Sequence, residues 1–174
     1  MKEIPASYWP FKVDHINDYA WIHDVFSKEE REKCIEDLQP LLVNIPTMRG
    51  RQTHPTLHLL PQFSPLISRI LKLSIEYTGL ELIVHSAWAK LSNGKKECVG
   101  WHDHLASGVD YSSVYYIKVP FLMRNGTLFR DGLCKAPQNS LLIFPAHLEH
   151  TTPRHFFGGE RYTFTVDFKY DHDG

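Results

Sequence analysis

The sequence predicts a mainly β (α+β) protein in which helices cover one face of an antiparallel β-sandwich or jelly roll. Helical signals occur only in the first half of the 174 residues, and from residue 80 onward the hydrophobic pattern changes to short strands. The segments between these strands are too short for helical crossovers, which argues against a parallel α/β sheet. We therefore expect a single domain over 1–174, with a helical support and lid region over 1–79 and a jelly-roll core over 80–170.

Two N-terminal helices are predicted from their boundary signals. Ser27 and Glu30 have the spacing of a capping box, in which each side chain accepts a hydrogen bond from the other residue's backbone N–H. Ser64 followed by Pro65 predicts a second helix with Ser64 as N-cap, and Gly79 is a typical helix end. Apolar residues at helical spacing follow both starts, so both helices are expected to pack on one sheet.

Six strand candidates follow the second helix. Residues with strand propensity alternate within each of them, and Gly, Pro, Asn and Asp separate them. The candidates are LELIVHSAWAKLS, VGWHDHL, SSVYYIKVP, GTLFRD, NSLLIFPAHLEH and RYTFTVDFKY.

The bulk composition narrows the function classes. Nineteen basic and twenty acidic residues give a formal charge of −1 with no basic run, so the charge gives no strong signal for a nucleic-acid partner. The three cysteines form no CxxC pair, which favours a reducing compartment. We find no signal-peptide pattern and no apolar run of membrane-spanning length, so the sequence predicts a soluble cytoplasmic protein with no membrane partner.

The stretch GWHDHL contains the first candidate metal ligands. In a regular strand, His102 and His104 would face one side and Asp103 the other. Two imidazoles directed at one point suit a metal ion, and a third ligand is expected from another strand, for which His150 is the best candidate.

The last strand candidate has two different faces. Tyr162, Phe164, Val166 and Phe168 lie on one face, and Arg161, Thr163, Thr165 and Asp167 on the other. The polar face either is solvated or lines a polar cavity. In a cavity, the Arg161 guanidinium and the Thr163 hydroxyl could together hold a carboxylate.

The run WHDH…SSVYYIKVP…NGTLF…NSLLIFPAHLEHTTP…ERYTFTVDF resembles the Fe(II)/2-oxoglutarate-dependent oxygenases. It is most similar to the prolyl-hydroxylase-like branch and to short bacterial and phage relatives of that branch. The resemblance covers roughly residues 84–168. It includes the eleven-residue distance from His150 to Arg161, which matches the family's distance from the last iron ligand to the cosubstrate arginine.

The resemblance implies a double-stranded β-helix with iron inside and assigns roles to individual residues. His102 and His150 fall on the first and last iron ligands, and Arg161 falls on the residue that binds the distal carboxylate of 2-oxoglutarate. Further cosubstrate contacts are implied for Tyr116, Thr163, Ser112 and Leu128, and a place at the substrate pocket for Trp88 and Asp103. The sequence departs from the family pattern at His104, where the family has a carboxylate ligand.

Three outcomes follow from this departure. In the first, His102, His104 and His150 bind iron. In the second, His104 turns away and leaves room for chloride or water. In the third, the site binds zinc. We favour the three-histidine iron site, which keeps three protein ligands but loses one negative charge.

The implied activity is hydroxylation of a substrate C–H bond, with Fe(II), 2-oxoglutarate and O2 as cofactors, ascorbate as a reductant, and succinate and CO2 as coproducts. No catalytic residue beyond the metal ligands is expected. The substrate would be a prolyl or other amino-acid residue of a protein, or a small molecule. The alternatives are a three-histidine dioxygenase or zinc enzyme without 2-oxoglutarate, and a non-catalytic jelly-roll protein. Arg161 and Tyr116 discriminate between them, because only the first activity needs a dicarboxylate clamp.

Overall fold

The computed structural model describes residues 20–45, 50–92, 100–120, 126–153 and 159–171, so both ends of the predicted 1–174 domain lie outside it. The elements in chain order are β1 (Ala20–His23), α1 (Lys28–Leu38), η2 (Gln39–Leu41), β2 (Val43–Asn44), β3 (Arg51–Gln52), η3 (Leu57–Leu59), η4 (Pro61–Phe63), α2 (Ser64–Thr78), β4 (Leu82–Ser92), η5 (Leu105–Ser107), β5 (Tyr111–Lys118), β6 (Gly126–Phe129), β7 (Gly132–Lys135), β8 (Ser140–Pro145), β9 (His150–Thr151) and β10 (Arg161–Tyr170).

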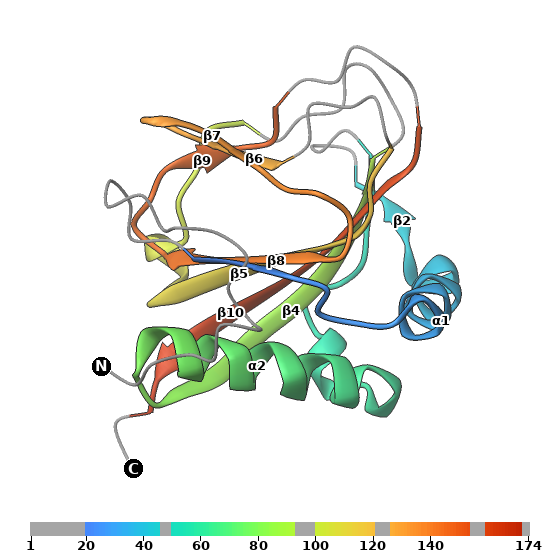
Figure 1. The fold of residues 1–174 in the computed structure, drawn as a ribbon, viewed down its shortest axis with the longest axis horizontal. Helices are drawn as coiled ribbons and strands as arrows, with labels where there is room; N and C mark the ends of the chain where they lie inside the picture. Colours follow the sequence, from blue (N-terminus) through green and yellow to red (C-terminus); the bar gives the residue numbers. More distant parts are fainter. Residues whose placement is uncertain (1–19, 46–49, 93–99, 121–125, 154–158, 172–174) are drawn as a thin grey trace.

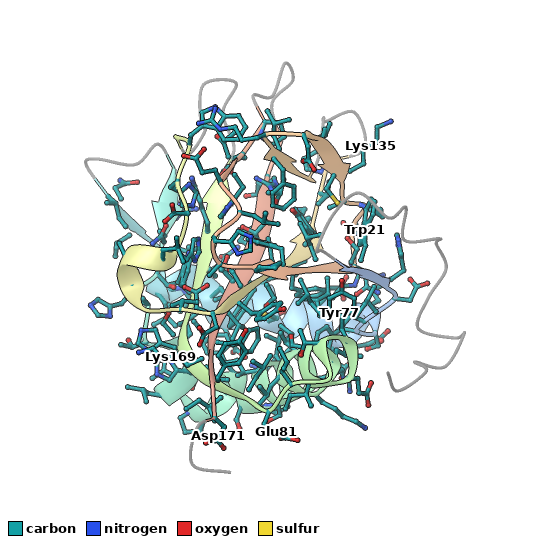
Figure 2. All side chains as sticks on the ribbon, turned by 90° about the vertical axis from the view of Figure 1, so that its left-hand side faces the viewer. Trp21, Tyr77, Glu81, Lys135, Lys169 and Asp171 are labelled. Carbon is teal, nitrogen blue, oxygen red and sulfur yellow. The ribbon has the colours of Figure 1, made fainter. Side chains whose placement is uncertain are left out.

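Two antiparallel sheets face each other. The major sheet has the strand order β1-β8-β5-β10-β4-β3-β2, and the minor sheet has the order β7-β6-β9. Figure 1 shows the minor sheet above the major sheet, with α2 across the opposite face of the major sheet below β4 and β10. In Figure 2, Lys135 of β7 lies at one end of the molecule, and Glu81 and Asp171 lie at the other. This arrangement confirms the predicted mainly β jelly roll with helices on one sheet.

The first helix begins as predicted. The Ser27 hydroxyl accepts a hydrogen bond from the Glu30 N–H at 3.2 Å, and the Glu30 carboxylate accepts one from the Ser27 N–H at 2.7 Å. The capping box therefore satisfies two backbone donors that the first turn would otherwise leave unpaired.

The second helix begins differently from the prediction. Ser64 is its first helical residue and does not cap it; the N-cap is Phe63, with no side-chain hydrogen bond. The reason is that η4 runs directly into α2, so Phe63 already has helical backbone angles, whereas a side-chain cap needs an extended N-cap residue. Gly79 ends the helix with a φ of +69°, as predicted. Within the described ranges, neither α1 nor α2 combines the length and the apolar content that spanning a bilayer requires.

The two faces of the major sheet have different surroundings. Apolar side chains of β1, β4, β5, β8 and β10 pack with α1 and α2 in the main hydrophobic core. On the opposite face, which looks toward the minor sheet, a smaller cluster forms from Tyr116, Phe129, Cys134, Ala136, Leu142 and Phe144. The polar residues of β10 lie on this same face, inside the jelly roll.

Two of the strand predictions are wrong in detail. The segment NSLLIFPAHLEH is two strands, because β8 ends at Pro145, and a turn then carries the chain to the minor sheet, where β9 pairs with β6. The described part of VGWHDHL is not a strand: it forms one isolated bridge, between His102 and His150, and then enters η5.

Candidate metal centre

Three histidines meet inside the jelly roll. His102 and His104 come from the segment before η5, and His150 is the first residue of β9. One ligand atom from each lies within 4.8 Å of the others, and the ring centroids are 4.3 to 5.4 Å apart. The structure thus brings together all three histidines that the sequence analysis selected.

Backbone hydrogen bonds hold the two histidine segments together. The His102 N–H donates to the His150 carbonyl at 3.1 Å, and the His150 N–H donates back to the His102 carbonyl at 2.9 Å. The His104 N–H donates to the Ala146 carbonyl at 3.0 Å. The segment 146–150 therefore fixes the backbone positions of all three histidines.

The ring nitrogens have a common arrangement. The Nδ1 atoms of His102 and His150 lie 2.8 and 2.9 Å from the carbonyls of Gly100 and Leu148. The Nδ1 atom of His104 lies 2.9 and 3.0 Å from the two carboxylate oxygens of Asp167. Carbonyl and carboxylate oxygens only accept hydrogen bonds, so each Nδ1 is a donor and Nε2 is the ring atom left to bind a metal ion. Three Nε2 donors suit iron, nickel, copper or zinc.

Burial keeps two of these imidazoles neutral. It is the main cause that lowers the pKa of His102, and the nearby His104 and Lys90 act in the same direction. Burial also lowers the pKa of His150 to about 3. A metal ion binds neutral imidazole, so these rings need not lose a proton before binding at neutral pH.

Asp103 does not join the cluster. Its side chain is exposed, and its Oδ1 accepts a hydrogen bond from the Leu105 N–H at 3.1 Å, which supports the turn into η5. The place of Asp103 at the substrate pocket stays a prediction; the structure shows that its carboxylate is exposed and lies outside the histidine cluster.

The polar face of β10 is buried rather than solvated. Arg161 is 4% exposed, and Thr163, Thr165 and Asp167 are also buried. β10 lies in the middle of the major sheet, with the helices packed on one face and the minor sheet over the other. The solvated alternative of the sequence analysis is therefore excluded for these residues, and the cavity-lining alternative stays a prediction.

Arg161 is a buried cation without an anionic partner among the described residues. Its Nη2 donates to the Gly126 carbonyl at 3.1 Å, but its Nε is buried and has no hydrogen-bond partner there. The guanidinium carbon lies 5.3 Å from the centre of the Tyr116 ring. Burial lowers the pKa of Arg161, yet the group stays charged. A buried guanidinium with an open donor fits a carboxylate ligand.

Hydroxyl groups gather beside this guanidinium. The Tyr116 and Thr127 hydroxyls lie 2.6 Å apart, and burial raises the pKa of Tyr116 to about 12, so its proton is retained. Thr163 lies opposite Tyr116 in the sheet. Thr127, on β6, is absent from the sequence analysis, because nothing in the motif GTLF marks it as facing Arg161.

Gly126 lies next to the Arg161 guanidinium. Its φ is +132°, and a Cβ there would lie 1.8 Å from the Cys134 carbonyl oxygen. Only glycine allows this close approach of β6 to β7, and the approach orients the carbonyl that accepts from Arg161.

The remaining predicted residues lie at different places along the interior. Leu128 is half-buried on β6 and pairs with Thr151. Ser112 lies opposite Asp167, about 13 Å along β5 from Tyr116 by strand geometry, and so at the histidine end rather than the arginine end. Its buried Oγ has no hydrogen-bond partner in the part of the chain described.

Trp88 lies next to the histidines. Its ring is half-buried, stacks on His104 with the centroids 5.9 Å apart and belongs to neither hydrophobic cluster. Lys90, two residues further along β4, is 8% exposed and lies opposite Thr163. The sequence analysis did not select Lys90; its even spacing from Trp88 is the signal that would have placed it on this face.

The sequence matches no protein-family model and no curated protein. Solved structures do match the fold. HygX from Streptomyces hygroscopicus, in a structure with nickel, 2-oxoglutarate and hygromycin B bound, has a TM-score of 0.73 at 15% identity, covering 90% of this chain and 84% of that one. An oxidoreductase of the 2OG-Fe(II) oxygenase family from Burkholderia pseudomallei has a TM-score of 0.68 at 15% identity, covering 90% and 86%.

A third similar structure is a viral collagen prolyl hydroxylase from Paramecium Bursaria Chlorella virus-1 in its 2-oxoglutarate complex. It has a TM-score of 0.64 at 15% identity, and the match covers 92% of this chain and 100% of that chain. The chain therefore has the double-stranded β-helix fold of the Fe(II)- and 2-oxoglutarate-dependent oxygenases.

Proposed function

We propose that the protein is an Fe(II)- and 2-oxoglutarate-dependent oxygenase that hydroxylates a C–H bond of its substrate and releases succinate and CO2. One observation carries the proposal. The same interior holds three clustered imidazoles whose Nδ1 atoms all face oxygen acceptors, and a buried guanidinium without an anionic partner among the described residues. These are the two features that a metal ion and a dicarboxylate cosubstrate require.

In this proposal, His102, His104 and His150 hold the metal through Nε2. Three protein ligands leave the other coordination positions open. The bound iron and 2-oxoglutarate would supply the activation of O2 and the oxidative decarboxylation. The protein provides the ligand geometry and a dry cavity, and the aromatic rings of Phe144 and Phe129 pack against His150 to exclude water from it.

Arg161 is assigned to the distal carboxylate of the cosubstrate. Its free Nε–H and the hydroxyls of Tyr116, Thr127 and Thr163 form a donor set around one corner of the cavity. Leu128 would contact the carbon chain. Pairing with a carboxylate would relieve the cost of a buried uncompensated charge, so the cosubstrate should also stabilise the fold.

The substrate is assigned only by class. The open side of the cluster carries Trp88 stacked on His104, which suits a substrate with an apolar or ring-shaped group beside the reacting carbon. A prolyl or other amino-acid residue has this character. So does a small-molecule ring.

The test is an anaerobic titration of metal-free protein with Fe(II) and then with 2-oxoglutarate, followed by visible absorption. The bidentate chelate should give a weak metal-to-ligand charge-transfer band. The band should be lost in His150→Ala and kept in His147→Ala, because His147 is exposed three residues earlier. Succinate release under O2 with ascorbate added then measures turnover.

Other outcomes would redirect the assignment. Fe(II) binding without a band would favour a three-histidine dioxygenase or a zinc enzyme that does not use 2-oxoglutarate. Absence of metal binding would favour a non-catalytic jelly roll. Arg161→Lys should bind Fe(II) normally and 2-oxoglutarate weakly; normal cosubstrate binding by this variant would remove Arg161 from the site.

A further inference from the structure

Asp167 is a buried carboxylate joined to the histidine cluster. Both of its oxygens lie within 3.0 Å of the His104 Nδ1, and the two side chains are 4% and 8% exposed. His102 and His150 use backbone carbonyls for the same purpose. Of the three rings, His104 alone is thus held by a charged group.

The contact between Asp167 and His104 matters because of the charge of the histidine cluster. Imidazole ligands contribute no negative charge, so the protein ligands by themselves leave the charge of a bound divalent cation uncompensated. Asp103, the neighbouring carboxylate in sequence, is exposed and used in a turn. Asp167 is the carboxylate that the described structure places directly behind a ligand ring.

The surroundings of Asp167 are arranged for a carboxylate. In the sheet it lies between Ser112 of β5 and Ser86 of β4. The buried Ser112 Oγ has no other partner among the described residues, so its hydroxyl is free to face the carboxylate. The Trp88 ring stacks on the His104 ring.

We infer that Asp167 is a positioning residue for the metal: it fixes the His104 ring with Nε2 directed inward and supplies, one ring further out, the negative charge that no protein ligand provides. This inference rests on the proposed metal site. A carboxylate behind a ligating histidine holds its tautomer and makes it a stronger donor. The alternative is a purely structural role, in which Asp167 only holds the segment 100–105 against β10 through its contact with His104.

The first experiment measures metal affinity by calorimetry with Co(II), an air-stable substitute for Fe(II). Asp167→Asn should weaken Co(II) binding by about 10- to 100-fold, the usual loss for such an outer carboxylate. Asp110→Asn is the matched control. Asp110 is a half-buried carboxylate that accepts from the Tyr170 N–H at 2.8 Å and should leave the affinity unchanged.

The second experiment separates charge from structure by a double-mutant cycle. His104→Asp introduces a carboxylate that could itself bind the metal, but it then faces Asp167, and two buried carboxylates repel each other. Adding Asp167→Asn should therefore strengthen Co(II) binding in the His104→Asp background, although it weakens binding in the wild-type background. A structural tie gives a loss in both backgrounds.

The outcomes are separable. If wild-type protein binds no Co(II), Zn(II) or Fe(II), the proposed function fails. If it binds metal and Asp167→Asn binds equally well, the inference fails and the proposed function stands. Should Asp167→Asn not fold, the comparison of His104→Asp with the double variant still decides, because a loss of affinity there contradicts the charge role.

Discussion

The two faces of β10 are equally buried and chemically opposite. Tyr162, Phe164, Val166 and Phe168 face the helices and are at most 1% exposed, while Arg161, Thr163, Thr165 and Asp167 face the jelly-roll interior and are at most 8% exposed. The first face is satisfied by apolar packing. The second keeps a buried cation without an anionic partner in the described structure. One face stabilises the fold, and the other carries a cost that only ligands would offset.

The largest expected effect on stability is on the apolar face. Phe164→Ala should lower the free energy of unfolding by about 3–5 kcal/mol, because the ring is fully buried and packs against Phe63 at a centroid distance of 5.8 Å. Urea denaturation of the metal-free protein measures this. A loss below about 1 kcal/mol would mean that this face is not the structural one.

The interior face should make the stability of the protein depend on pH. Burial lowers the pKa of His150 from 6.5 to about 3, so the unfolded chain takes up a proton in this range and the folded chain does not. The free energy of unfolding of metal-free protein should therefore fall as the pH is lowered from 6.5 toward 3. His150→Gln should flatten this dependence, and the exposed His147→Gln should not. An unchanged slope in His150→Gln would contradict the assigned burial.

A smaller effect is expected outside both faces. Ser27→Ala removes the N-cap of α1 and should cost about 1 kcal/mol in urea denaturation. Affinity for Co(II) should not change, because α1 packs in the main core, whereas His150 packs against Phe129 and Phe144 of the other cluster. A parallel loss of metal affinity would show that the two faces are energetically coupled.

The smallest effect on stability is expected for a substitution of Arg161, and this substitution should differ most in its effects on stability and on cosubstrate binding. Arg161→Met replaces a buried charge by an apolar chain of similar length, so the ligand-free protein should be as stable as wild type or more so. Affinity for 2-oxoglutarate should fall by at least about 100-fold in the absorption titration. If the variant were several kcal/mol less stable without ligand, Arg161 would belong to the structural set.

Local signals in the sequence predicted the fold well. The Ser27–Glu30 capping box and the Gly79 helix end depend on neighbouring residues, and both are confirmed. The Ser64 cap is wrong, because η4 precedes it without an extended residue. The strand break after Pro145 was also missed, since it depends on pairing with β6, a contact between distant segments.

The candidate site shows the same limit. Spacing and resemblance selected His102, His104, His150 and Arg161, and the structure places all four in the interior. Strand parity put Asp167 on the correct face but gave no reason to join it to His104, 63 residues away in sequence. Asp103 was also selected, and its carboxylate is exposed and accepts from the Leu105 N–H in the turn into η5, outside the histidine cluster. Contacts between residues as far apart in sequence as His104 and Asp167 can be identified only from the folded structure.

The bridge between His102 and His150 joins the histidine cluster to the edge strand of the minor sheet. The two reciprocal hydrogen bonds, at 3.1 and 2.9 Å, are the last pair at this edge of the minor sheet, and they join the backbones of two of the three histidines. A metal ion bound by both rings would add a second connection between these two backbone segments at the edge of the sheet. Deuterium uptake at these two amides should slow markedly when metal is added, while uptake in α1 stays the same.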